Sequence, residues 1–244
     1  MIDQGQILYT GGKGLLGSEF RKQLPGLNYV DIEDFNITDY QDIDRYFSGK
    51  KIKQVIHAAA FTSPPKCDQE PEKAIDANII GTCNMVKICM KLGIKLIYIC
   101  TDYVFKGDKG NYKEDDPVYP VNKYAWSKLG GECAVRMYDN SLIIRTTFGP
   151  NVFPYEKAFV DQWTSRESVS SIVKRIVKLL DKDIKGTVHV GGIRKTVFQY
   201  AKSLDSTKDI KELSIHDVNF RVPEDTSLDT SKYDGLLETG GNKV

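Results

Sequence analysis

The chain has 244 residues, enough for one large α/β domain or for a domain with a small additional lobe. Its formal charge at pH 7 is +1, with basic and acidic residues interspersed, which argues against nucleic-acid and membrane partners. No apolar run reaches the roughly 18 residues of a membrane-spanning helix, and the first residues lack a signal-peptide pattern. We therefore expect a globular cytoplasmic protein.

Cysteine usage supports the same location. The five cysteines form no CxxC pair and show no metal-ligand spacing, so we expect reduced thiols, several of them buried, and no metal site. They are Cys67, Cys83, Cys89, Cys100 and Cys133.

Strands and helices alternate along most of the chain. The predicted strands cover residues 6–9, 27–32, 53–60, 95–100, 142–145 and 187–190. The predicted helices cover residues 15–24, 71–92, about 122–138 and 167–180. Near-continuous apolar strands separated by amphipathic helices predict a parallel sheet covered on both faces. Right-handed crossovers make this a doubly wound, Rossmann-type α/β fold, with ligands at the carboxyl ends of the strands.

The composition changes near the C-terminus. From Ser206 onward the chain becomes polar, with turn signals such as Val222-Pro223-Glu224-Asp225. We expect residues 1–149 plus about 186–205 to form a dinucleotide-binding domain. Residues about 150–185 plus 206–244 should form a small substrate lobe.

A glycine-rich turn, Tyr9–Gly17, directly follows the first predicted strand. Gly11 and Gly12 can take the positive φ values of a tight turn, and Gly14 lets a pyrophosphate approach the backbone. Gly17 lets the next helix pack closely. The N–H groups at the start of that helix form an anion site, so the turn predicts dinucleotide binding.

Asp31 closes the second apolar stretch, 20 residues after Gly11. A carboxylate there can accept both hydroxyls of an adenosine ribose. Lys13, inside the glycine turn, can instead attract a 2′-phosphate. The two residues point to different cofactors, so NADH and NADPH both remain open.

Candidate catalytic residues lie at and beyond the fourth strand. Tyr124 and Lys128, four positions apart on a predicted helix, share one helix face. An ammonium beside a phenol lowers the phenol pKa from its usual value near 10 and makes it a competent proton donor to a carbonyl that receives hydride. The hydroxyl of Thr101 can hold the same carbonyl oxygen.

The Tyr-x-x-x-Lys pattern also occurs at Tyr9, Tyr46 and Tyr119. The first lies in the glycine turn, the second at a frayed helix end, and the third encloses a proline that interrupts the helix. Only Tyr124 is followed by a long helix. His57, at the end of a buried strand, is expected to be structural.

The chain resembles the extended short-chain dehydrogenases, and among them the dTDP-4-dehydrorhamnose reductases. The matching segments are Thr10–Gly17, Val55–Thr62, Glu70–Glu72 leading to Asn78, Thr101–Phe105, Tyr124–Glu132, Ile144–Thr146, Asp161–Gln162 and Ser227–Lys232. The segment Thr101–Phe105 discriminates best. Nucleotide-sugar 4,6-dehydratases place an acid where this chain has Tyr103, which favours reduction over water elimination.

The resemblance implies NADPH or NADH as cofactor and a nucleotide sugar as substrate. The cofactor residues that it implies are Gly11, Gly14, Leu15, Leu16, Gly17, Asp31, Asn36, Ile37, Ala58, Ala59, Ala60, Thr62, Tyr124 and Lys128. Asp102, Tyr103 and Arg221 would contact the substrate. Hydride would pass to C4 of a nucleotide-linked 4-keto-6-deoxy sugar in rhamnose-type deoxysugar biosynthesis, while Tyr124 gives the proton. A homodimer is compatible with this resemblance.

The chain departs from the reductase pattern in the substrate lobe. The stretch before Asp161-Gln162 is short, and Trp163–Arg166 replaces the usual Gly-x-Pro-Thr. Three alternatives therefore stay open: a bifunctional 3,5-epimerase/4-reductase, a 4-epimerase, and a non-catalytic regulatory subunit like that of methionine adenosyltransferase. Retention of Thr101, Tyr124 and Lys128 argues for an enzyme.

Overall fold

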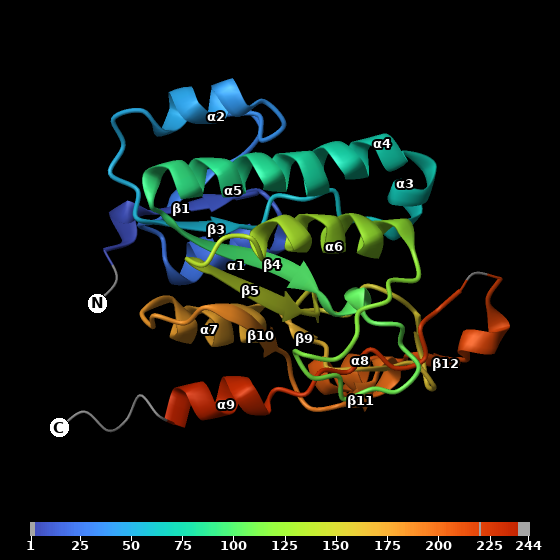
Figure 1. Cartoon of the computed structure of the whole chain (residues 1–244). Helices are drawn as coiled ribbons and strands as arrows, with labels where there is room; N and C mark the ends of the chain where they lie inside the picture. Colours follow the sequence, from blue (N-terminus) through green and yellow to red (C-terminus); the bar gives the residue numbers. More distant parts are fainter. Residues whose placement is uncertain (1–2, 220, 239–244) are drawn as a thin grey trace. The chain divides into compact units, whose positions relative to one another are not determined.

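The computed structural model describes residues 3–219 and 221–238 (Figure 1). Two compact units divide the chain. The first comprises the residues up to Thr101, Asn122–Ile144 and Leu179–Thr187, and the second comprises Asp102–Val121, Arg145–Lys178 and the residues from Val188 onward. The predicted dinucleotide-binding domain and substrate lobe, with the boundaries given in the sequence analysis, stay a prediction.

A six-stranded parallel sheet confirms the predicted α/β fold class. In spatial order its strands are β10 (Gly186–Val190), β5 (Ser141–Thr146), β4 (Lys95–Thr101), β3 (Gln54–His57), β1 (Ile7–Thr10) and β2 (Asn28–Val30). Thr10 lies opposite both Val30 and His57, so β1, β2 and β3 end level. The chain order reverses at β1, which is where doubly wound sheets bind their ligands.

Helices cover the part of this sheet in the first unit on both faces (Figure 1). Helices α2 (Tyr40–Phe47), α5 (Gly81–Leu92) and α6 (Lys123–Val135) lie along one face, and α1 (Leu15–Gln23) lies on the other. All four residues of β3 are buried. Burial from both sides explains why the strands read as continuous apolar runs.

The region between β3 and α5 is more broken than predicted. The expected single helix over residues 71–92 consists of α4 (Pro71–Ala74), a π-helical turn (Ile75–Ile80) and α5, preceded by α3 (Pro64–Gln69). The π-helical turn is a wider form of helix that is frequent at functional sites. Helix α2 is also additional to the prediction. The side chain of Asp39 caps it by accepting hydrogen bonds from Gln41 N and Asp42 N, at 2.9 and 3.3 Å.

The described residues of the second unit contain helices and several short strand ladders. The helices are α7 (Val169–Leu180), which extends to the boundary of the unit at Lys178, α8 (Val197–Leu204) and α9 (Ser231–Glu238). The strand pairs are β6 (Phe148–Gly149) with β9 (Glu167–Ser168), β8 (Trp163–Thr164) with β11 (Lys195–Thr196), and β7 (Lys157–Phe159) with β12 (Lys211–Leu213). The 3-10 turns among the described residues of both units are Gln4–Gln6, Asp102–Val104 and Ile215–Asp217. Thus the polar tail after Ser206 contains a helix and a strand that its sparse apolar residues did not signal.

The glycine turn is shaped by close backbone contacts. Gly11 has φ +78°, and a Cβ there would lie 2.9 Å from the N and Cα atoms of Ala59. A positive φ was expected at both Gly11 and Gly12, but of these two only Gly11 has one. The N–H groups of both residues donate to Val30 O at 3.0 Å, so a single left-handed residue is enough to close the turn. A Cβ on Gly17 would lie 2.6 Å from Gly11 O, so α1 packs directly on the turn.

We predict that Gly17→Ala lowers the free energy of unfolding by about 1–3 kcal/mol, because the added methyl group must displace the backbone of the turn. Gly14→Ala is the matched control. Its Cβ would meet only Gly11 O, at 3.3 Å, and its φ of −67° is open to alanine. Urea denaturation of both variants gives the comparison, and equal losses would contradict the packing described for this turn.

Candidate functional site

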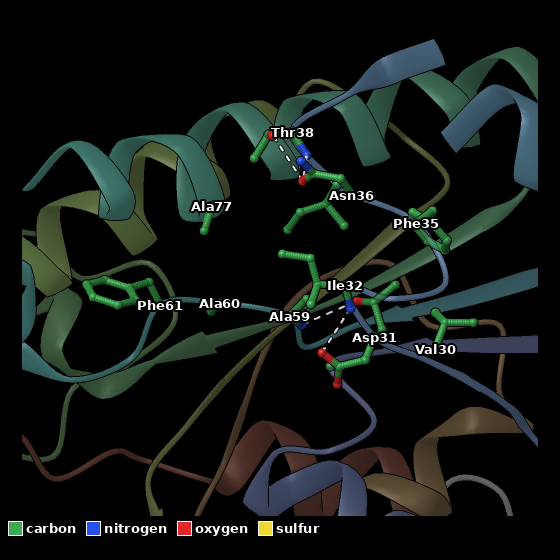
Figure 2. Close-up of a pocket in the computed structure, with 13 residues that line it drawn as sticks. Val30, Asp31, Ile32, Phe35, Asn36, Thr38, Ala59, Ala60, Phe61 and Ala77 are labelled. Atoms are coloured by element: carbon green, nitrogen blue, oxygen red, sulfur yellow. Dashed lines mark hydrogen bonds between the residues drawn. The ribbon is translucent and has the colours of Figure 1, made fainter. Parts of the chain in front are cut away.

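A pocket of about 270 Å³ opens at the carboxyl ends of β1, β2 and β3 (Figure 2). Its lining residues are Thr10, Gly11, Val30, Asp31, Ile32, Phe35, Asn36, Ile37, Thr38, Ala59, Ala60, Phe61 and Ala77. Six of the predicted cofactor residues are among them: Gly11, Asp31, Asn36, Ile37, Ala59 and Ala60. The walls are mostly apolar with a few polar groups, as in most small-molecule sites.

Asp31 provides the acidic group of the pocket. Its Oδ2 accepts a hydrogen bond from Lys13 N at 2.9 Å, and its Oδ1 accepts one from Ile32 N at 3.0 Å. Because a carboxylate has about four acceptor positions, two remain for a ligand. The ammonium of Lys13 donates to Glu33 Oε1 at 2.6 Å, and this hydrogen bond is the main cause of its raised pKa.

The opposite wall is held by an asparagine of α5. Asn84 Nδ2 donates to the carbonyl oxygens of Ile37 and Thr38, both at 3.1 Å. Asn36 Oδ1 in turn accepts from the N and Oγ1 atoms of Thr38. Figure 2 places Asn36 and Thr38 toward the helices and Asp31 at the strand ends. Asn84 is not among the residues predicted from the sequence, although a buried amide on a helix requires partners of this kind.

A buried histidine joins the strands beneath the pocket. His57 Nδ1 lies 2.8 Å from Thr10 Oγ1, and His57 Nε2 lies 3.1 Å from Thr82 Oγ1. Thr10 Oγ1 also accepts from Ala59 N at 3.2 Å. Burial lowers the pKa of His57 to about 3, so the ring is neutral and bridges β1, β3 and α5. This bonding agrees with the structural role expected for it.

The predicted phosphate-binding residues begin α1. Gly14 is the N-cap and contributes no capping side chain, and Leu15, Leu16 and Gly17 form the first turn. A helix N-terminus capped by glycine leaves its backbone N–H groups accessible to a pyrophosphate. These four residues lie in the glycine turn and at the start of α1, and they do not line the pocket. Ala58 and Thr62, in the loop after β3, do not line it either.

Lys128 is buried in α6, with 3% of its surface exposed. Its Nζ lies 4.2 Å from the centre of the Tyr98 ring, a cation–π contact. The Tyr98 hydroxyl donates to Lys128 O at 3.0 Å and ties α6 to β4. Desolvation lowers the pKa of Lys128 from 10.5 to about 8, although Cys100 and Glu132 favour its charged form.

Glu132 lies one helical turn after Lys128 and has no exposed surface. Its Oε1 accepts hydrogen bonds from Arg136 Nε at 2.9 Å and Arg136 Nη2 at 2.8 Å. This carboxylate is the buried negative charge that partly offsets the ammonium on the same helix.

The two other predicted catalytic residues lie on the same pair of elements. Thr101 is the last residue of β4 and is 6% exposed. Tyr124 is half-buried in the first turn of α6, where the side chain of Asn122 caps the helix by accepting from Ala125 N at 2.8 Å. The fold therefore brings Thr101, Tyr124 and Lys128 to two packed neighbours, β4 and α6, and their role in proton transfer stays a prediction.

Asn78, in the π-helical turn, connects the pocket to the turn that carries Tyr124. Its Oδ1 accepts from Phe61 N at 2.7 Å, while its Nδ2 donates to Phe61 O at 2.9 Å and to Ser127 Oγ at 2.7 Å. Ser127 Oγ donates to Tyr124 O at 2.8 Å. Asn78 ends one of the segments that carry the family resemblance, but the sequence alone does not predict that its side chain bridges Phe61 and Ser127.

The predicted substrate residues lie in the second unit. Asp102 is buried, and its Oδ2 accepts from Thr226 Oγ1 at 2.7 Å, so it orders the segment around Thr226. Tyr103 forms side-chain hydrogen bonds with Gln162 and Arg166, and desolvation raises its pKa. Arg221 is exposed. Contact of Asp102, Tyr103 and Arg221 with a substrate stays a prediction.

The described part of the chain offers neither a membrane-spanning helix nor a metal cluster. None of its helices is both long and apolar enough to cross a membrane. Within residues 3–219 and 221–238, no group of three or more His, Cys, Asp or Glu side chains is placed to hold a metal ion.

Comparison with known proteins identifies relatives along most of the chain. Residues 5–174 match the family described as RmlD substrate binding domain. Methionine adenosyltransferase 2 subunit beta of Mus musculus is 25% identical over 280 residues, covering 96% of this chain and 83% of that protein. The dTDP-4-dehydrorhamnose reductase of Aggregatibacter actinomycetemcomitans is 31% identical over 197 residues, covering 77% of this chain and 62% of that protein.

A solved structure gives the same fold. The dTDP-4-dehydrorhamnose reductase of Bacillus anthracis, crystallised in complex with NADP, superposes with a TM-score of 0.83. It is 24% identical, and the superposition covers 97% of this chain and 92% of that one. The match supports the Rossmann-type architecture described above.

We predict that substitutions of Asn84 and Asn78 have different effects on dinucleotide affinity and on the rate of hydride transfer. Asn84→Ala leaves the carbonyl oxygens of Ile37 and Thr38 without their donor, and leaving a buried hydrogen-bonding group unsatisfied costs about 1–3 kcal/mol of folding free energy. The substitution should weaken dinucleotide binding more than it affects later steps. Asn78→Ala removes the bridge to the turn of Tyr124 and should lower the rate of hydride transfer more than the affinity. Fluorescence titration gives the affinity, and single-turnover kinetics give the rate.

Thermal melting of both asparagine variants serves as the control for folding. If both variants changed the dinucleotide affinity equally and the hydride-transfer rate equally, the separate roles given to Asn84 and Asn78 would be contradicted. Each asparagine would then act only through the general stability of the fold.

Proposed function

Since the chain belongs to the RmlD substrate-binding-domain family, we propose that it is an NAD(P)H-dependent reductase of a nucleotide-linked 4-keto-6-deoxy sugar. This reaction belongs to deoxysugar biosynthesis of the rhamnose type. The observation that carries the proposal is the buried ammonium of Lys128, four residues after Tyr124 on α6. The first turn of this helix is joined through Ser127 and Asn78 to Phe61 in the wall of a pocket at the strand ends.

The residues present fit a nicotinamide dinucleotide. Asp31 keeps two acceptor positions that suit a ribose diol, and the pocket beside it is apolar enough for an adenine. The glycine-capped start of α1 suits the pyrophosphate, with Leu15, Leu16 and Gly17 supplying backbone N–H groups. Gly14, whose own N–H donates to Gly11 O at 3.1 Å, has no side chain and lets the pyrophosphate approach the backbone. When bound, the dinucleotide supplies the hydride that reduces the sugar carbonyl.

Tyr124 is the proton donor in this proposal. Its phenol O–H bond breaks as the carbonyl oxygen takes the proton, so that the ketone becomes a secondary alcohol. The positive charge of Lys128 stabilises the phenolate that remains, which lowers the barrier to proton transfer. Thr101, at the end of β4, orients the same oxygen with its hydroxyl group.

The substrate residues are proposed from the second unit. Tyr103 stands where the similar 4,6-dehydratases carry an acid, which favours reduction over elimination of water. Asp102 would act by ordering the segment around Thr226, and Arg221 would bind the substrate diphosphate through its guanidinium fork. Arg166, hydrogen-bonded to Tyr103, is a further cation in this part of the chain.

Two alternatives remain distinct from a simple reductase. One is a non-catalytic, dinucleotide-binding regulatory subunit, and it is supported by the alignment of methionine adenosyltransferase 2 subunit beta of Mus musculus with 96% of this chain. A bifunctional 3,5-epimerase/4-reductase would act on the same substrate class and would exchange sugar protons with solvent before reduction. A regulatory subunit needs no proton donor, so retention of Thr101, Tyr124 and Lys128 supports the enzyme.

We also propose a cytoplasmic location and a homodimer. Five free thiols support the reducing compartment. Size-exclusion chromatography with light scattering decides the oligomeric state.

The direct test supplies NADH or NADPH with dTDP- and UDP-linked 4-keto-6-deoxy sugars and follows loss of nicotinamide absorbance. We expect turnover with at least one sugar nucleotide. Carrying out the reaction in deuterated water and finding label at C3 and C5 would favour the bifunctional enzyme. Intact dinucleotide binding without turnover on either substrate would favour the regulatory subunit.

Tyr124→Phe should retain dinucleotide affinity and lose about 10²- to 10⁴-fold in turnover, the usual contribution of one general acid. Tyr46→Phe is the matched control. It also belongs to a Tyr-x-x-x-Lys pair, but Lys50 Nζ lies 3.6 Å over its ring at the end of α2, and the substitution keeps that ring. An unchanged rate in Tyr124→Phe, measured beside the control, would refute the assignment of the proton donor.

A further inference from the structure

The ribose side of the pocket carries an excess of negative charge. Asp31, Glu33 and Asp34 all interact electrostatically with the ammonium of Lys13. Lys13 itself is paired with Glu33. The guanidinium of Arg21 lies over the Tyr29 ring, 4.2 Å from its centre. Three carboxylates therefore surround one ammonium group beside the cofactor pocket.

The carboxylate of Asp31 is held in place by the backbone. Hydrogen bonds from Lys13 N and Ile32 N fix one oxygen each, and Asp34 Oδ2 accepts from Asp31 N at 2.8 Å. The remaining acceptor positions of Asp31 match the two hydroxyl donors of an unmodified ribose. A 2′-phosphate has no proton to donate there when fully ionised, and it would bring negative charge against Asp31.

Lys13 is the residue in the glycine turn that could attract such a phosphate. Its Nζ lies 2.6 Å from Glu33 Oε1, in a pair with both side chains exposed, 67% and 63%. To bind a 2′-phosphate, Lys13 must leave Glu33, which would then stand unpaired beside the phosphate. Glu33 thereby cancels the cation that NADPH would need.

We infer that this chain selects NADH over NADPH, and that Asp31 and Glu33 set the preference, Asp31 by binding the ribose diol and Glu33 by neutralising Lys13. The inference rests on the proposed function and narrows its cofactor. Like-charge contacts against the wrong ligand are an established source of discrimination, and they act here without any contact to the nicotinamide.

The test is a fluorescence titration of the protein with NADH and with NADPH, in the absence of sugar substrate. At low ionic strength we expect NADH to bind at least about tenfold more tightly, since repulsion between close charges exceeds the factor-of-ten threshold of 1.4 kcal/mol. The ratio should shrink as salt is added, because the charges at this rim are exposed and are screened by ions.

Two variants separate the two roles. Glu33→Gln frees Lys13 and should tighten NADPH binding severalfold while NADH affinity changes less than about twofold. Asp31→Asn should weaken NADH binding and abolish most of the discrimination. Glu212→Gln, which removes the same charge from the exposed strand β12, is the control and should change neither affinity.

Equal affinities for the two dinucleotides, or tighter binding of NADPH by the unaltered chain, would overturn the inference and leave the proposed reductase intact. An unchanged NADPH affinity in Glu33→Gln would overturn the role of that residue even if Asp31→Asn fails to fold. Failure of both dinucleotides to bind would contradict the proposed function itself.

Discussion

The burial of a positive charge at Lys128 is the constraint around which the first unit is arranged. Its ammonium is removed from water, and the face of the Tyr98 ring and the carboxylate of Glu132 partly replace the lost hydration. A pKa lowered from 10.5 to about 8 means that the folded state binds this proton less tightly than the unfolded state, by roughly 3 kcal/mol. The penalty is fully present below pH 8 and is relieved as the pH rises from about 8 to 10.5, where the unfolded state holds more protons. A protein that accepts such a cost has a use for the charge, and a neighbouring phenol provides one.

The pocket and the helix turn that carries Tyr124 are connected by polar groups rather than by apolar packing alone. Asn78 links Phe61, in the pocket wall, to Ser127 and through it to the turn of Tyr124. Asn84 fixes the other wall from the next part of the same helical segment. The π-helical turn between α4 and α5 contains Asn78, so the irregularity of the helix coincides with the point where the two halves of the site meet. A few hydrogen bonds therefore couple the pocket wall to the helix turn that carries the proposed proton donor.

Local sequence signals predicted the parts of this site that depend on local geometry. The continuous apolar strands, the glycine turn, Asp31 at a strand end and the Tyr124/Lys128 spacing all follow from neighbouring residues, and the structure places them at β1, β2 and α6. The bonds of Asn84 could not be predicted in this way, because Ile37 O lies 47 residues earlier in the chain. The same holds for the Lys13–Glu33 pair, whose members are 20 residues apart and exposed. Helix α9 was missed because it lies in a polar segment that carries few apolar residues.

The protonation of Lys128 is the most direct test of this account. NMR titration of protein labelled with ¹³C at lysine Cε resolves individual ammonium groups, and Lys128→Met identifies the resonance by its disappearance. We predict that this resonance titrates near pH 8, well below ordinary lysines. Titration of the same resonance at the ordinary lysine pKa near 10.4 would show that the ammonium is hydrated, and it would contradict the buried cation on which the proposed chemistry depends.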